Sequence, residues 1–250
     1  MAWTKLKLAL TVGVGVLLAA GTTTVVVEKV VSPTVDEKFW KPGFKNFDRI
    51  PPVLILRPTR YPSSNTHWKT GTADAREILL NTDLGYLLND AYSTSDHRRI
   101  LSANIPHKHF DLMLTVRDHQ KEALQKELAR QFGFTGRREM IETNVLWLQI
   151  KDPELLAQHV HQHHKMDFKT GPGLWSWAGF HMDSVAGVLE DLFQQPVIIQ
   201  TGLEDTYDLT LQWGEHEDEK QAVTEDLAQA GLELVPHHEP VEMVIVEKKH

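Results

Sequence analysis

The chain has 250 residues, of which 41% are hydrophobic and 24% charged, so it can form one large domain or two small ones and is neither disordered nor fibrous. Its formal net charge of -8 argues against a nucleic-acid-binding protein, because phosphate neutralisation needs a concentrated excess of Lys and Arg. The absence of cysteine excludes disulfides, thiol nucleophiles and a cysteine-linked lipid anchor.

The N-terminus carries an uncharged run of Leu, Val, Ala, Gly and Thr at residues 8–27, about as long as a helix that crosses the hydrocarbon core. Lys5 and Lys7 precede it, so the positive-inside rule predicts a cytoplasmic N-terminus. Residues 1–30 are therefore predicted to anchor a single-pass protein of the bacterial cell membrane, with a periplasmic C-terminal bulk. A cleaved signal peptide ending near Ala19-Ala20-Gly21, or a core element of a soluble fold, stays open as an alternative.

Residues 31–52 read as a linker, because four prolines and scattered charges interrupt any periodicity. The folded part is predicted to begin near Val53.

A first α+β module is predicted over residues 53–151. Its expected elements are a helix over 75–92 capped by Asp74, a strand over 110–114, a helix ending at Gly133, and a hairpin of residues 134–141 and 144–150. Residues 152–173 are predicted to connect it to a second module, through a helix from Asp152 to about His164 and a Gly-Pro-Gly turn.

The second module, residues 174–250, repeats this order. A helix is predicted over 183–193, a strand over 207–211, a helix ending at Gly231, and a hairpin of residues 232–236 and 241–246. The two strands share an aromatic-Asp-Leu-x-Leu pattern, with Phe110 and Tyr207 about 97 residues apart. The sequence thus predicts a tandem duplication of a strand-helix-strand-helix-hairpin module, each a small sheet covered on one face by two helices.

The stretch from Gln195 to Trp213 reads QPVIIQTGLEDTYDLTLQW, and it resembles the RPVVDRTGLTGRYDFTLEW signature of a soil-associated bacterial family of unknown function. The segments 231–234 and 240–246 resemble that family's C-terminal end, whereas Ile199-Gln200 replaces its common Asp-Arg. The resemblance implies an exported α+β protein and assigns no chemistry. More loosely, such modules are similar to the short N-terminal domains of secretins and TonB-dependent receptors, which bind partners in the envelope.

Histidines cluster at His159, His161, His163 and His164, within the predicted connecting helix. On a helix, His159 and His163 lie at i, i+4, a spacing at which two imidazoles can share a Zn or Ni ion. No Glu lies between them in the H-E-x-x-H manner, so an exposed polar helix is the competing interpretation.

Other residues favour structural roles. Asp111 and Asp208 hold equivalent places in the two predicted modules, which favours ion pairing or turn capping over acid–base catalysis. Trp175 and Trp177 alternate on one predicted strand and are expected in the core, with a ligand-stacking platform as the alternative. No serine has a nucleophile-elbow context.

The sequence therefore predicts a non-enzymatic envelope protein that binds an unidentified protein partner through sheet edges and helix faces. No catalytic or cofactor-binding residue is predicted, and neither is a nucleic-acid partner. A His-rich divalent-metal-binding exported protein is the alternative, and a hydrolase whose site assembles only in three dimensions is a third.

Overall fold

A computed structural model of the chain describes residues 36–41, 47, 49–64, 66–69, 76–102, 104–162, 165–200, 205–214 and 218–249. The chain divides into two compact units, Met1–Val31 and Ser32–His250, and the first lies outside the described residues, as does the predicted anchor at 8–27. In the part of the chain that is described, no helix is both long and apolar enough to span a membrane.

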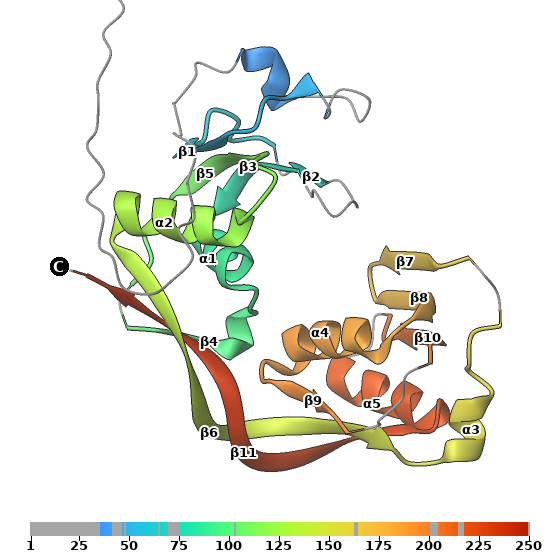
Figure 1. The fold of residues 1–250 in the computed structure, drawn as a ribbon. Coiled ribbons are helices and arrows are strands. Elements are labelled where there is room, and N and C mark those ends of the chain that lie inside the picture. The colour runs from blue at the N-terminus through green and yellow to red at the C-terminus, as the bar shows by residue number, and fades with distance from the viewer. Residues whose placement is uncertain are drawn as a thin grey trace, which may run out of the picture. The chain divides into compact units, whose positions relative to one another are not determined.

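The fold is mixed α+β with three sheets (Figure 1). In chain order the elements are η1 (Glu37–Trp40), β1 (Leu54–Pro58), β2 (Thr66–Lys69), β3 (Glu77–Asp83), α1 (Leu84–Tyr92), η3 (Asp96–Arg98), β4 (Arg99–Leu101), β5 (His109–Leu114), α2 (Gln120–Phe132), β6 (Phe134–Ile150), α3 (Pro153–Ala157), β7 (Asp167–Gly171), β8 (Leu174–Phe180), α4 (Met182–Phe193), β9 (Val197–Ile199), β10 (Tyr207–Gln212), α5 (Glu219–Gln229) and β11 (Leu232–Lys248). The predicted helix 183–193 and strands 110–114 and 207–211 are confirmed as α4, β5 and β10.

The sheets have the strand orders β1-β5-β3-β2, β10-β8-β7 and β4-β11-β6-β9. Helices α1 and α2 cover one face of the first sheet, and their leucines share a core with Leu79 and Leu112. A second core joins α4 and α5 to β8, β10 and one end of β6 and β11. Within each of these two regions, strands and helices thus bury a common apolar interior.

The two predicted hairpins are wrong, because β6 and β11 are single strands of 17 residues each. They pair antiparallel over their whole length, from Phe134 opposite Lys248 to Ile150 opposite Leu232, and lie side by side in Figure 1. Pro236 and Pro240 interrupted the alternation in the sequence. Both lie an even number of residues from Val246, whose carbonyl points away from β6 and toward β4, so their backbone groups point to the same side of β11. Their missing N–H groups therefore lie on the unpaired edge of β11, where proline costs no ladder bond.

The predicted helix over 75–92 is also wrong in its first half. Residues 77–83 form β3, and α1 begins at Leu84 with Asp83 as its cap, whose carboxylate accepts from the Tyr86 N–H at 2.8 Å. Ile78, Leu79 and Leu80 are fully buried, and an apolar run buried on both faces cannot be distinguished from a helix by periodicity. The predicted cap, Asp74, lies outside the described residues.

The second face of β3 is covered by residues that the sequence assigned to a linker. Trp40, Phe47 and Ile50 are buried against Ile78 and Leu80. The segment around η1 is therefore part of the packed body and not a spacer.

Helix ends follow the expected chemistry. Gly133 and Gly231 adopt the left-handed conformation, with φ of 76° and 80°, which glycine reaches without a Cβ penalty. Asp152 caps α3, but that helix ends at Ala157 and does not reach His164 as predicted. His159 lies beyond the end of α3, so it is not on the helix that was predicted to carry the i, i+4 pair.

Candidate functional site: a groove between α4 and β9

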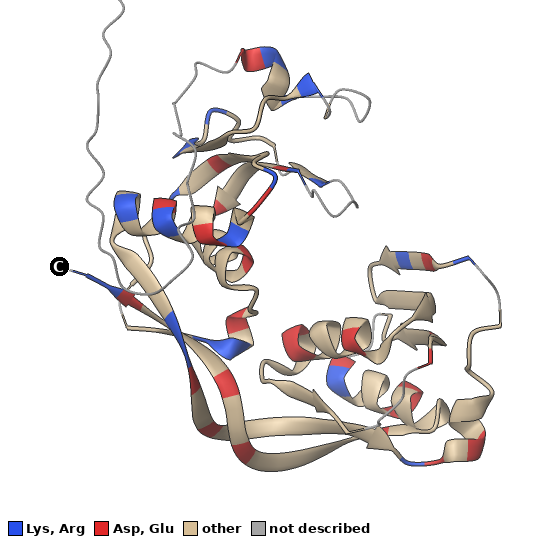
Figure 2. Cartoon of the chain, in the orientation of Figure 1, with Lys and Arg blue, Asp and Glu red and all other residues tan. Residues whose placement is uncertain are grey.

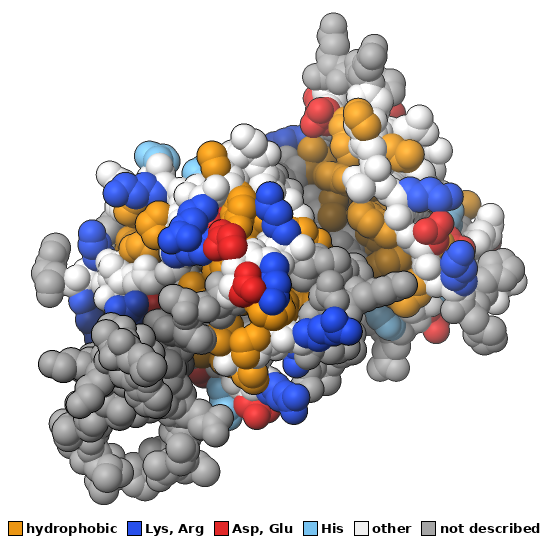
Figure 3. Space-filling model, turned by 90° about the horizontal axis from the view of Figure 1, so that it is seen from above, with side chains coloured by type: hydrophobic (Ala, Val, Ile, Leu, Met, Phe, Trp, Pro, Cys, Tyr) orange, Lys and Arg blue, Asp and Glu red, His pale blue; other side chains and the backbone are white. Residues whose placement is uncertain are grey.

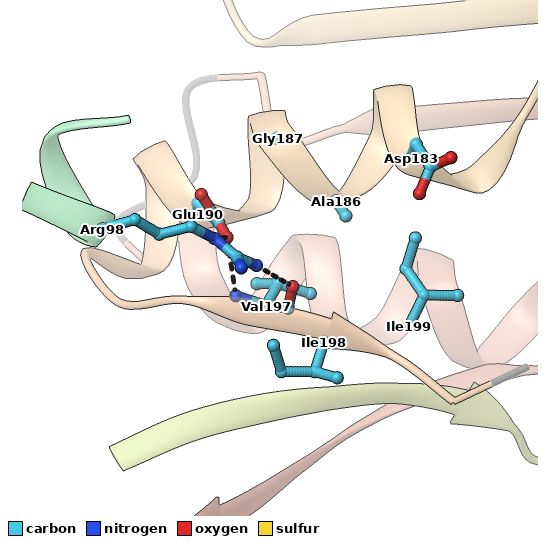
Figure 4. Close-up of a pocket in the computed structure, with 8 residues that line it drawn as sticks. All are labelled: Arg98, Asp183, Ala186, Gly187, Glu190, Val197, Ile198 and Ile199. Atoms are coloured by element: carbon cyan, nitrogen blue, oxygen red, sulfur yellow. Dashed lines mark hydrogen bonds and ion pairs between the residues drawn. The ribbon is translucent and has the colours of Figure 1, made fainter. Parts of the chain in front are cut away.

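A groove of about 450 Å³ runs between helix α4 and the short strand β9 (Figure 4). Its lining residues come from α4, β9 and the end of η3, and they are Asp183, Ala186, Gly187, Glu190, Val197, Ile198, Ile199 and Arg98. Strand β9 is an edge strand, because it pairs with β6 on one side and ends the order β4-β11-β6-β9.

The ladder between β6 and β9 shows which backbone groups face the groove. The Leu146 N–H donates to the Pro196 carbonyl and the Gln200 N–H donates to the Leu148 carbonyl, both at 2.9 Å. In a parallel pair alternate residues bond to the same neighbour, so Val197 and Ile199 direct their N–H and C=O groups away from β6. These two residues form the free edge of the sheet.

Side chains occupy the edge at Val197. Its N–H donates to Glu190 Oε1 at 3.0 Å, and its carbonyl accepts from Arg98 Nη2 at 2.8 Å. Arg98 Nε also donates to Glu190 Oε1 at 2.6 Å, and Ser95 donates to Glu190 Oε2 at 2.8 Å. The Arg98–Glu190 pair thus supplies the donor and the acceptor that a neighbouring strand would offer, which blunts the edge at this residue (Figure 4).

The edge at Ile199 is not occupied in this way. Among the described residues, no group makes a hydrogen bond to its N–H or to its C=O. Its side chain packs with the α4 core, and Asp183 lines the same groove without an ion pair to any described residue. A backbone donor, a backbone acceptor and a carboxylate are therefore available beside the aliphatic side chains of Ile198 and Ile199.

In the first half of the chain, a side chain fills the space between α1 and the edge strand β4. Arg99 extends from β4 to the carbonyl of Gly85 and the side chains of Asn89 and Asp96, and only 7% of its side chain is exposed. Burial lowers the pKa of this guanidinium from its usual value, and the carboxylates of Asp96 and Asp83 oppose that effect.

Val197 and Gly187 follow Arg99 and Asn89 at an offset of 98 residues, and a Cβ added at Gly187 would meet nothing within 4 Å. Neither residue places a long side chain in the groove. A glycine in a helix interior costs about 1 kcal/mol relative to alanine, so Gly187 was the one sequence signal of this site.

The predicted histidine site is only partly described. His159 follows α3 and its Nδ1 lies 3.1 Å from the Asp208 carbonyl, while His161 Nδ1 lies 2.6 Å from Asp208 Oδ1. His163 and His164 lie outside the described residues, and the described part holds no group of three metal-ligating side chains. Metal binding stays a prediction, which calorimetric titration of zinc against His159→Ala plus His163→Ala would test.

Asp111 and Asp208 both serve the backbone, as predicted. Asp111 is fully buried and accepts from the Thr59 hydroxyl at 2.7 Å and from the N–H groups of Arg60 and Asn81 at 3.0 and 3.2 Å. Asp208 accepts from the Gly179 N–H at 2.9 Å. Each carboxylate stabilises a bulge in its sheet, at a residue with positive φ.

A second hollow of about 500 Å³ lies beside β10 and α5 and is lined by His159, Ser176, Asp208 and Asp226 among others. Its carboxylates are engaged, because Asp226 accepts from the Gln212 N–H at 2.6 Å and Asp208 holds Gly179. Trp177 is buried and Trp175 packs edge-on against Trp213 at 4.4 Å, which confirms that both belong to the core.

Residues 85–248, more than half of the chain, match the model of a family described as a protein of unknown function, DUF3738. The chain belongs to that family. No curated protein matches it, and neither does any solved structure.

Proposed function

We propose that this chain is a non-enzymatic, membrane-anchored protein of the bacterial cell envelope that binds another protein in the α4–β9 groove. The observation that carries this proposal is the uncovered edge of β9 at Ile199, which lies in an open groove. Between α1 and β4, by contrast, the side chain of Arg99 fills the space. Proteins cover or blunt edge strands unless they use them, and an edge beside a helix is a common place for protein recognition.

Two features of the described acids support a binding role over an enzymatic one. Asp111 is held by backbone N–H groups and the guanidinium of Arg57, and Glu190 is held by Arg98 and Ser95. A general acid or base has to reach a substrate, whereas these carboxylates are hydrogen-bonded to groups of the protein itself.

We also propose that the two halves are copies of one unit. The order strand, helix, strand, strand, helix, long strand occurs over β3–β6 and again over β8–β11. Gly133 and Gly231 end the second helix of each at an offset of 98 residues, and Asn81 and Gly179 have positive φ at the same offset. In addition, β4 and β9 both pair parallel with a long strand. This is consistent with the resemblance to the soil-associated family and, at fold level, to secretin and TonB-receptor N-terminal domains.

Export rests on the apolar run at residues 8–27 and the lysines before it. The absence of cysteine makes a direct test simple, because one cysteine placed at exposed Lys126 on α2 would be the only thiol. A membrane-impermeant maleimide should label Lys126→Cys in cells with a permeabilised outer membrane. Labelling only after lysis would contradict the periplasmic location.

Binding is tested by placing a photo-crosslinking amino acid at Ser184, an exposed residue one helical turn before Gly187. Irradiation of cells should give a discrete protein adduct. The same amino acid at Thr224, an exposed residue of α5, is the control and should give none. No adduct at Ser184, or the same adduct at both sites, would contradict groove binding.

A further inference from the structure

We infer that the groove takes an extended, Lys- or Arg-containing segment of a partner protein, which adds to β9 as a further strand of the sheet β4-β11-β6-β9. This inference rests on the proposed function and specifies the chemistry of the ligand.

The backbone of Ile199 provides the pairing. Its N–H and C=O both point away from β6, so one residue of an incoming strand can exchange two hydrogen bonds with it. At Val197 the same two positions are already filled by Glu190 and Arg98. The Arg98–Glu190 pair therefore marks the point where the added strand ends.

The groove wall selects an apolar side chain. Gly187 leaves open space above the strand, since a Cβ there would meet nothing within 4 Å, and Ala186 adds only a methyl group. Ile199 lies opposite on the α4 side of the strand (Figure 4). An aliphatic side chain of the added strand would bury its surface between these residues, at roughly 25 cal/mol per Å².

Charge selects the neighbouring residue. Asp183 lines the groove and has no ion pair among the described residues. Figure 2 marks acidic residues on helices α4 and α5, and Lys220 is the one basic residue within these two helices. A carboxylate in such surroundings attracts a lysine or arginine and accelerates its association.

Other exposed hydrophobic residues of the described chain lie outside the groove. The large ones are Tyr86, Ile100, Leu101, Met140, Leu155, Met166 and Phe168, of which Ile100 and Leu101 are neighbours on the edge strand β4. On the face drawn in Figure 3, hydrophobic side chains form patches interrupted by charged ones. The groove combines the aliphatic side chains of Ile198 and Ile199 and the carboxylate of Asp183 with the free backbone groups of Ile199.

The test uses the full chain in detergent micelles and a phage library of random twelve-residue peptides. Enriched peptides should contain alternating aliphatic residues and at least one Lys or Arg. Their dissociation constants, measured by fluorescence anisotropy, should rise about tenfold in Ile199→Pro, which removes an outward N–H and no bond to β6. Leu101→Pro is the matched control, because Leu101 holds the outward position in β4 and should change binding less than about twofold.

Two further variants separate the parts of the site. Gly187→Leu fills the groove without touching the backbone and should weaken binding about tenfold or more. Asp183→Lys should weaken basic peptides and abolish the salt dependence of their affinity.

Peptides that bind Ile199→Pro and Gly187→Leu as well as the natural chain would overturn strand addition, and so would a library that enriches none. An adduct at Ser184 together with either result would leave the proposed function intact. If the adduct is absent as well, both fail.

Discussion

The two grooves of this chain differ in one physical respect. Between α1 and β4, the nearly buried side chain of Arg99 crosses from strand to helix and donates to the Gly85 carbonyl and to two side chains, so it fills the space between them. Between α4 and β9, Val197 and Gly187 leave about 450 Å³ open. A helix beside an edge strand is thus closed by one long cationic side chain in one half of the chain and left accessible in the other. Under the duplication that we propose, Val197 and Gly187 stand in place of Arg99 and Asn89, and these two shorter residues account for the difference.

The aspartates at the two sheet bulges also differ in exposure, with the first-half residue buried and the second-half residue open to solvent. The Asp111 side chain is 0% exposed and has four partners, whereas the Asp208 side chain is 45% exposed. The first half therefore uses buried polar groups where the second half is open to water. The following predictions test that contrast.

The largest effect is expected for Asp111→Ala. It leaves the N–H groups of Arg60 and Asn81 without an acceptor and leaves the guanidinium of Arg57 with Glu37 alone, and removal of one partner from a buried network costs about 3–5 kcal/mol. Asp208→Ala should cost less, about 1–3 kcal/mol, because it removes the partner of the Gly179 N–H and of His161 Nδ1 but at a place where the carboxylate itself is 45% exposed. Urea denaturation measures both. Equal losses would show that the two bulges are supported alike.

Arg99→Ala should come next, with a loss of about 2 kcal/mol. The change leaves the Gly85 carbonyl and Asn89 without their donor in a nearly buried place. The melting temperature should fall by roughly 4–8 °C on that basis. Arg130→Ala is the control, because its pair with Glu127 is exposed and should be worth less than about 1 kcal/mol. Similar shifts in both variants would mean that Arg99 does not close its groove in solution.

The sequence could predict this contrast only in part. Helix α4, the glycine caps and the strands β5 and β10 were readable, because local periodicity and cap chemistry decide them. The long pairing of β6 with β11 was not, since it depends on contacts between strands about a hundred residues apart, and its exposed middle has the polar composition of a turn.

The groove was hidden for a related reason. It depends on which residues of β9 direct their N–H and C=O groups away from β6. The pairing with β6 decides this, and the residue types of β9 do not. Arg98 and Glu190 lie 92 residues apart, and only the fold brings them to Val197. Gly187 signalled an unusual helix position but not what lies beside it.

A smaller effect is expected at a buried acid that the second half lacks. Glu77 is 4% exposed beside Asp90 and Lys69, whereas Trp175 and Val188 lie at the same offset in the second half and pack with its core. Burial raises the pKa of the Glu77 carboxyl above its usual value of 4.5, and the charge of Asp90 raises it further.

Because the folded-state pKa of Glu77 is raised, its contribution to stability is present below pH 4.5 and lost as the pH rises through the folded value. At pH 7, Glu77→Gln should therefore melt a few degrees higher than the natural chain, corresponding to about 1 kcal/mol. At pH 4 the variant and the natural chain should melt at the same temperature. Melting curves at both pH values decide this. A variant that melts lower at pH 7 would show that the pairing with Lys69 outweighs burial.

The smallest effect, and one of opposite sign, is expected for Gly187→Ala. Its Cβ enters empty space, and alanine loses less backbone entropy than glycine in a helix, so the free energy of unfolding should rise by about 0.5–1 kcal/mol. Gly136→Ala is the matched comparison on β6, where a Cβ would lie 2.6 Å from the Tyr92 ring and should destabilise the chain by about 1–3 kcal/mol. Urea denaturation of both variants measures the pair. If Gly187→Ala gains stability and binds peptides more weakly, the open groove reduces the stability of the chain and serves binding. If the variant loses stability, the groove is filled in solution.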